Sequence, residues 1–209
     1  MTGEKGSVSD AIGTFFEDRL RRSIPGLEDY RDCDNAPDFK WETRWIEAKA
    51  ALDNIGYGII PKGYQVNRDK KRENLVYACG YHDFKRAMQR LPQPTLRGKV
   101  NYIEWNARIA KLFFVSSSVI YGIWNAGFRH NKTLNQAYYR IPAYMFAEIA
   151  NNKTIRRRDR VGPAREVYGL DELVCHPAES IGCVLTPADY EALAPMMALI
   201  NPALFERRR

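Results

Sequence analysis

The sequence lacks the features that mark membrane and secreted proteins. No apolar run in its 209 residues approaches the roughly 20 residues that a membrane helix requires, so we expect no membrane span and no membrane partner. The first ten residues lack the basic-then-apolar layout of a secretory signal. The four cysteines are widely spaced and contain no CxxC pair, which argues against a disulfide framework. These absences predict a reduced, cytoplasmic protein.

Several catalytic and nucleotide-binding motifs are missing as well. The sequence contains neither GxxxxGK nor GxGxxG, so it gives no indication of ATP or dinucleotide binding. The serines at 116–118 are not part of a GxSxG motif, which argues against a serine hydrolase. Cys175, His176 and Cys183 would supply only three of the four ligands of a structural zinc site, so zinc is not favoured.

The composition is that of one basic globular unit. Hydrophobic residues make up 45% of the chain, which is enough for a core, and the length predicts a single domain over 1–209. The net charge is +7, and a basic surface attracts polyanions such as nucleic acid. Within this background, residues 28–38 contain five acids and only one base, Arg31. An acidic cluster repels a polyanion unless a cation is bound there, and this contrast is the first functional indication.

Hydrophobic periodicity and turn residues predict alternating strands and helices. Helices are expected at 9–23, at 134–150 with a start or kink at Pro142, and at 187–199 with Thr186 as the cap; extended segments are expected at 27–33, 37–41, 44–50, 75–81, 100–108 and 111–124, and loops at 53–74 and 153–165. This alternation predicts an α/β or α+β fold around a mixed sheet. We expect the core to span about 8–125, followed by a helical, basic C-terminal extension at about 130–209.

The segment at 37–50 carries the chemistry. A hairpin centred on Glu42 and Thr43 would pair Phe39 with Ile46 and set Asp38 opposite Glu47. Phe39, Ile46, Ala48 and Ala50 would then point into the core, while Asp38, Glu47 and Lys49 would share the other face, because side chains alternate along a strand. Two directly opposed carboxylates destabilise a sheet unless a cation lies between them. Such a pair suits Mg²⁺, and Lys49 could polarise an attacking water or stabilise developing negative charge.

Pro37-Asp38, followed after eight residues by Glu47-Ala48-Lys49, resembles the signature of the PD-(D/E)xK nuclease superfamily. The resemblance covers about 12–50 and implies a restriction-endonuclease-like mixed β-sheet flanked by helices, with additional C-terminal helices. It also implies that Asp38 and Glu47 bind the metal and that Lys49 assists the attacking water. Many members add a glutamate from the preceding helix, and Glu17 matches that place. The neighbouring Asp18 would face about 100° away around the helix, so only one of the two can serve.

These residues predict a metal-dependent DNA endonuclease, restriction-like or resolvase-like. Its catalytic residues would be Glu17, Asp38, Glu47 and Lys49, and the metal would be Mg²⁺, with Mn²⁺ as a substitute, held by Asp38, Glu47 and Glu17. The expected partner is duplex or branched DNA, and a homodimer is expected because cutting both strands commonly needs two sites. The alternative is a non-catalytic nucleic-acid-binding or assembly protein that retains the nuclease fold.

Two further observations qualify the site. The acid-x-Lys triplet occurs four times: at Asp38/Lys40, Glu47/Lys49, Asp69/Lys71 and Asp83/Lys85. Only Glu47 follows an apolar strand start with Pro-Asp upstream, although Asp83, which trails a predicted strand, is a serious competitor. The segment at 153–165 is strongly basic. It would contact backbone phosphates through Lys153, Arg156, Arg157, Arg158 and Arg160, and the alternative is a solvated loop.

Overall fold

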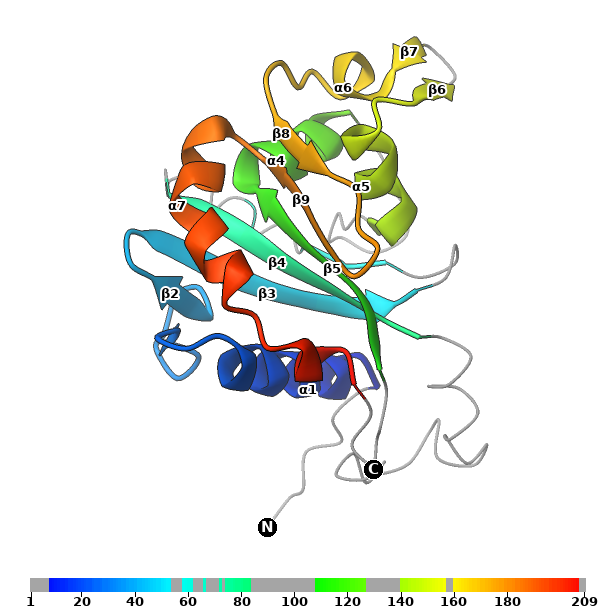
Figure 1. Ribbon diagram of the computed structural model, residues 1–209. Coiled ribbons are helices and arrows are strands. Elements are labelled where there is room, and N and C mark those ends of the chain that lie inside the picture. Colours follow the sequence, from blue (N-terminus) through cyan, green and yellow to red (C-terminus); the bar gives the residue numbers. More distant parts are fainter. Residues whose placement is uncertain are drawn as a thin grey trace.

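A computed structural model describes residues 8–53, 58–61, 66, 72, 74–83, 108–126, 140–156 and 160–206, with side chains from Ile12 onward (Figure 1). In chain order the elements are α1 (Val8–Ser23), β1 (Glu28–Asp29), β2 (Phe39–Trp41), β3 (Arg44–Leu52), β4 (Leu75–His82), β5 (Ile109–Ser116), α4 (Ser117–Asn125), α5 (Ala143–Ala150), β6 (Thr154–Arg156), β7 (Val161–Pro163), α6 (Ala164–Val167), β8 (Val174–His176), β9 (Ile181–Leu185), α7 (Pro187–Ala198) and the 3₁₀ turn η3 (Pro202–Leu204). No helix in these ranges is long and apolar enough to cross a membrane.

The centre of the fold is a seven-stranded sheet in the order β1-β2-β3-β4-β5-β9-β8. The pairs β3–β4 and β5–β9 are parallel, whereas β1–β2, β2–β3, β4–β5 and β8–β9 are antiparallel. The predicted mixed α/β sheet flanked by helices is therefore confirmed. β4 lies in the middle and all eight of its residues are buried, as a strand covered on both faces requires.

Helices cover both faces of the sheet (Figure 1). On one face, α1 and α7 pack against a core that contains Phe16, Phe39, Ile46 and Phe114. On the other face, α4 and α5 cover a second core. Alternate residues of β3 belong to opposite faces, so Ile46 and Ala48 point toward α1, while Trp45 and Ala51 point toward α4 and α5.

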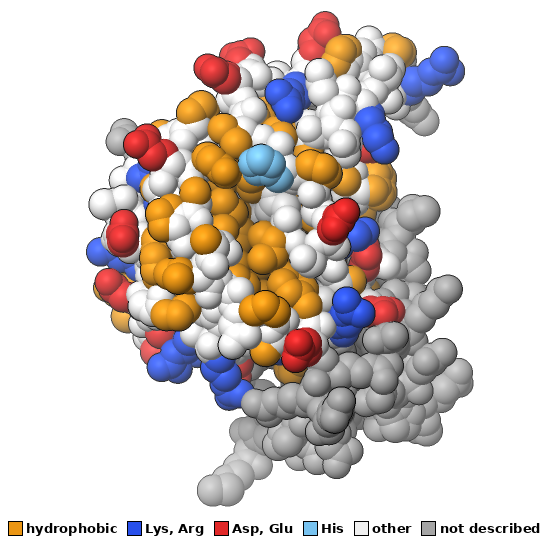
Figure 2. Space-filling view, in the orientation of Figure 1, with side chains coloured by type: hydrophobic (Ala, Val, Ile, Leu, Met, Phe, Trp, Pro, Cys, Tyr) orange, Lys and Arg blue, Asp and Glu red, His pale blue; other side chains and the backbone are white. Residues whose placement is uncertain are grey.

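The terminal helices follow the sequence prediction closely. α1 occupies the expected range, and its apolar stripe of Ile12, Phe16 and Leu20 is buried. α7 begins after Thr186, whose side-chain oxygen accepts a hydrogen bond from the Asp189 N–H, with Pro187 in the first turn. In Figure 2, the face that carries α7 is apolar at its centre, and its Lys and Arg side chains lie toward the margins.

Two of the predicted segments differ in the structure. The segment predicted to be extended at 111–124 divides at Ser116, so that its second half forms α4 and buries Val119, Ile120 and Ile123. Burial on the sheet outweighs the low helix propensity of its β-branched residues. The segment at 153–165, predicted to be a loop, forms the β6–β7 hairpin and the start of α6.

The C-terminal half also differs from a helical extension. β8 and β9 belong to the main sheet, and β9 lies beside β5, so the expected core boundary near residue 125 does not coincide with a sheet edge. The sequence signal for these strands is weak because they are only three and five residues long. Of the helix predicted at 134–150, residues 140–150 are described, and they are helical only in α5, which begins directly after Pro142.

Candidate active site

The β2–β3 hairpin has the predicted register. Phe39 pairs with Ile46, Lys40 with Trp45, and Trp41 with Arg44, so the connection consists of the two residues Glu42 and Thr43. Glu42 adopts a φ of 47°, which costs an L-residue about 1–2 kcal/mol. Burial of Phe39 and Ile46 fixes the register strongly, because a shift of one residue would move both side chains out of the core.

Asp38 reaches β3 in a different way from the predicted strand pairing. The β2–β3 ladder ends at Phe39 and Ile46, so Asp38 lies just before β2 and is not a ladder partner of Glu47. Its carboxylate instead accepts a hydrogen bond from the backbone N–H of Ala48 at 2.7 Å. The Asp38 side chain thus takes the place of a strand partner for Ala48, just beyond the last pair of the β2–β3 ladder. This contact holds the Asp38 carboxyl group against the strand that carries Glu47 and Lys49.

Glu47 and Lys49 form the buried part of the site. The Glu47 side chain is only 3% exposed, and its carboxylate accepts a hydrogen bond from the Lys49 ammonium group at 2.6 Å. Lys49 also donates to the carbonyl of Ala48 at 3.2 Å. Burial disfavours the Lys49 ammonium group, but the charges of Glu47 and Asp38 outweigh burial and raise its pKa. Lys49 is therefore a stable cation among carboxylates.

The four predicted site residues share one electrostatic environment. Burial, reinforced by the charge of Glu47, raises the pKa of Asp38 to about 7. Burial also raises the pKa of Glu17, and Lys49 and Glu47 act on it in opposite directions. The three carboxyl groups outnumber the two cations near them, which are Lys49 and, beside Glu17, Arg31. A bound cation would relieve this excess.

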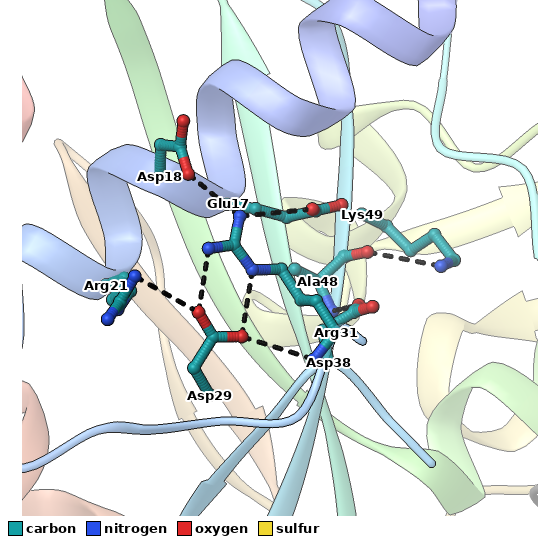
Figure 3. A network of polar contacts seen from close by, with 8 residues as sticks. All are labelled: Glu17, Asp18, Arg21, Asp29, Arg31, Asp38, Ala48 and Lys49. Carbon is teal, nitrogen blue, oxygen red and sulfur yellow. Dashed lines mark hydrogen bonds and ion pairs between the residues drawn. The ribbon is translucent and has the colours of Figure 1, made fainter. Parts of the chain in front are cut away.

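Arg31 is a member of the site that the sequence analysis did not identify (Figure 3). Its guanidinium group donates to the two carboxylate oxygens of Asp29 at 3.0 and 2.8 Å and to Asp18 at 2.8 Å, and it lies 3.7 Å from Glu17. Hydrogen bonding from Arg31 lowers the pKa of Asp29 to about 2. Arg31 therefore links the loop after β1 to the α1 residues beside the site. The available signal was its isolation as the one base among the acids of 28–38.

The predicted metal ligands Asp38, Glu47 and Glu17 are all described, and they do not form a group of three that could hold a metal ion. The same holds for every other group of three or more His, Cys, Asp or Glu side chains in the described part of the chain. Mg²⁺ is usually bound through one or two carboxylates and completes its shell with waters and substrate phosphate oxygens. Asp38 and Glu47 supply two carboxyl groups of that kind, and one oxygen of Glu47 accepts the hydrogen bond from Lys49.

The predicted basic residues lie elsewhere. Lys153, Arg156 and Arg160 are exposed at the β6–β7 hairpin, whereas Arg157 and Arg158 lie outside the described residues. In Figure 1 this hairpin and α1 lie at opposite ends of the molecule, so the structure does not bring these bases to the carboxylates.

The competing acid-x-Lys triplets, Asp69/Lys71 and Asp83/Lys85, fall largely outside the described residues. Asp83 directly follows β4, but Lys85 lies outside the described residues, as do Asp69 and Lys71. The two triplets of the hairpin, Asp38/Lys40 and Glu47/Lys49, are therefore the ones described in full. Comparison with known proteins found no family model, no curated protein and no solved structure that matches this chain.

Proposed function

We propose that this protein is a metal-dependent endonuclease that hydrolyses phosphodiester bonds of DNA, with a restriction-endonuclease-like arrangement of its site. The observation that carries the proposal is the convergence of Asp38 and Glu47 beside Lys49 at the end of the β2–β3 ladder. Burial and the charge of Glu47 raise the pKa of Asp38 to about 7. Keeping these two carboxyl groups together therefore lowers the stability of the fold. Such strained electrostatics are common at functional sites.

Each side chain has a definite role in this proposal. Asp38 and Glu47 would hold Mg²⁺, or Mn²⁺ in its place, and the ion would supply Lewis acidity and lower the pKa of a bound water. Lys49, fixed by Glu47 and the Ala48 carbonyl, places a positive charge where the phosphate gains negative charge in the transition state. Glu17 assists from α1, by hydrogen bonding or at a second ion. Arg31 restrains Glu17.

The substrate of the proposed enzyme is duplex or branched DNA. Lys153, Arg156, Arg157, Arg158 and Arg160 would contact backbone phosphates away from the cutting site, which adds affinity rather than sequence discrimination. Cleavage of both strands would need two sites, so we propose a homodimer as the active form.

The second candidate is a non-catalytic nucleic-acid-binding or assembly protein that retains this fold. The observation in its favour is the Lys49–Glu47 ion pair itself, because it already neutralises one of the two carboxylates that a metal would use. The two candidates make opposite predictions for hydrolysis but the same prediction for binding.

Cleavage assays separate these candidates. Linear, nicked, branched and single-stranded DNA are incubated with the protein and Mg²⁺ or Mn²⁺, in parallel with Lys49→Met and Asp38→Asn. We expect the wild-type protein to cut and both variants to bind DNA while losing at least about 100-fold in rate. Asp32→Asn, the same change at an exposed position in the acidic loop, is the control and should cut normally. Cutting that survives in both site variants would refute the assignment, and no cutting of any substrate would favour the second candidate.

A further inference from the structure

Trp45 is the centre of a cationic cluster next to the carboxylates. The Lys40 ammonium group lies 5.6 Å from the centre of the Trp45 ring, and the Arg72 guanidinium group lies 5.4 Å from it. Tyr30 packs against the same ring in an edge-to-face arrangement at 5.0 Å. Cation–π contacts of this kind hold a charged side chain in place without neutralising its charge.

Among the described residues, Lys40 and Arg72 are distinguished by having no acidic partner in an ion pair. Most of the basic side chains described near the sheet are paired with acids: Arg31 with Asp29 and Asp18, Arg44 with Asp189, Lys49 with Glu47, and Lys111 with Asp53. Within the described ranges, neither Lys40 nor Arg72 forms an ion pair. Glu28 lies opposite Lys40 in the β1–β2 ladder, but its carboxylate accepts a hydrogen bond from Tyr30 and forms no ion pair with Lys40. Arg72 donates to the carbonyl of Asn35, which orients it but leaves its charge unneutralised. Two positive charges are therefore held on one aromatic side chain.

The cluster lies on the same side of the hairpin as the proposed active site. Trp45 and Glu47 are two residues apart in β3, so alternation places their side chains on one face, and Lys40 is the strand partner of Trp45. Arg72 approaches from the segment before β4, where the Trp45 N–H donates to the Asn74 carbonyl at 2.8 Å. Residues two apart along a strand, such as Trp45 and Glu47, are separated by about 6.6–6.8 Å, so the cluster lies close to the carboxylates.

We propose that Lys40 and Arg72, held on the Trp45 ring, bind the phosphodiester backbone of the nucleic-acid strand adjacent to the phosphate that is cut. This inference rests on the proposed function and names the part of the chain that receives the substrate. The carboxylates alone would repel a polyanion, and two fixed cations beside them offset that repulsion. The cluster lies beside the site, whereas the basic β6–β7 hairpin lies at the far end of the molecule.

Binding measured against salt concentration tests the inference. DNA affinity is determined from low to moderate salt, in EDTA and again with Ca²⁺ to neutralise the carboxylates. The proteins compared are the wild type, the double variant Lys40→Gln/Arg72→Gln, and the matched variant Lys153→Gln/Arg156→Gln. Each lost phosphate contact lowers the slope of log affinity against log salt by about one, so the first double variant should lose about two. The charge-conserving variant Lys40→Arg/Arg72→Lys should retain the wild-type slope.

A second measurement reports on Trp45 itself. Phosphates bound to the two cations would change the electrostatic environment of the ring, so DNA should change the tryptophan fluorescence of the wild type, and Trp45→Phe should abolish that change. An unchanged slope in Lys40→Gln/Arg72→Gln, or a loss confined to Lys153→Gln/Arg156→Gln, would overturn the inference.

The outcomes for the two proposals can be distinguished. Cutting by the wild type together with an unchanged slope refutes only the phosphate site. A slope that falls by about two in a protein that never cuts supports the phosphate site and refutes the endonuclease. If the wild type binds no DNA under either condition, both proposals are wrong.

Discussion

Substitution of Asp38 by asparagine should stabilise the folded protein at alkaline pH while abolishing metal-dependent cutting. Asparagine is nearly isosteric with aspartate and can still accept the hydrogen bond from the Ala48 N–H. It removes the carboxyl group whose pKa is raised to about 7 by burial and by the charge of Glu47. The substitution therefore removes the unfavourable charge and keeps the local geometry.

The sign and size of the effect follow from proton linkage. Between the ordinary pKa of 3.8 and about 7, the folded state retains a proton that the unfolded chain has released. The contribution of Asp38 to the free energy of unfolding is therefore complete below about pH 4 and is lost as the pH rises to about 7. At about 1.4 kcal/mol per pH unit, the upper bound on the loss is about 4 kcal/mol. The charge of Glu47 is part of the cause, so Glu47→Gln should recover a share of the same loss.

Urea unfolding from pH 4.5 to 8.5 measures this effect. The free energy of unfolding of the wild type should fall relative to that of Asp38→Asn across the window, whereas the exposed control Asp32→Asn should follow the wild type. Added Mg²⁺ should stabilise the wild type at pH 8 and leave Asp38→Asn unaffected, because the carboxylate ligand is gone. Parallel pH profiles for the wild type and Asp38→Asn would refute the reasoning, since they would show that Asp38 is not buried beside a second carboxylate.

Two further predictions concern the elements that support the site. Asp189→Ala should lower the free energy of unfolding by about 3–5 kcal/mol, because Arg44, which donates to Asp189 at 2.8 Å, would lose its partner in a site where both side chains are nearly buried; a urea titration that finds a loss below about 1 kcal/mol would contradict this. Gly80→Ala should cost about 1–3 kcal/mol, because the new methyl group would overlap the Phe16 ring on α1. Gly13→Ala on the same helix is the matched control and should stabilise the protein by up to about 1 kcal/mol, because its methyl group would meet only Glu17 at 3.8 Å.

The hairpin could be predicted from the sequence because its information is local. Alternation of apolar and charged residues over Asp38–Lys49 fixes which side chains share a face, and burial of Phe39 and Ile46 fixes the register. The length of β2 could not be predicted in this way. β2 begins only at Phe39, so Asp38 contacts β3 through its side chain instead of pairing in the ladder.

The errors in the secondary-structure prediction have a common cause. The segment after Ser116 is rich in β-branched and aromatic residues, which favour a strand, yet it forms α4 because the sheet offers a face for Val119 and Ile123 to cover. β8 and β9 are short, and they exist as strands because β5 offers a free edge to β9. In both cases the deciding partner is far away in the sequence.

The sequence by itself determined the basic character of the protein, the alternation of strands and helices, the register of the β2–β3 hairpin, and the placement of Glu47 and Lys49 on one face of β3. Only the tertiary structure decided that Arg31 restrains Glu17, that Arg72 joins Lys40 on the Trp45 ring, and that the basic β6–β7 hairpin lies far from the carboxylates. The physical reason is range. Side-chain alternation along a strand acts over a few residues, whereas ion pairs and ring contacts join segments that meet only after the sheet and its helices have assembled.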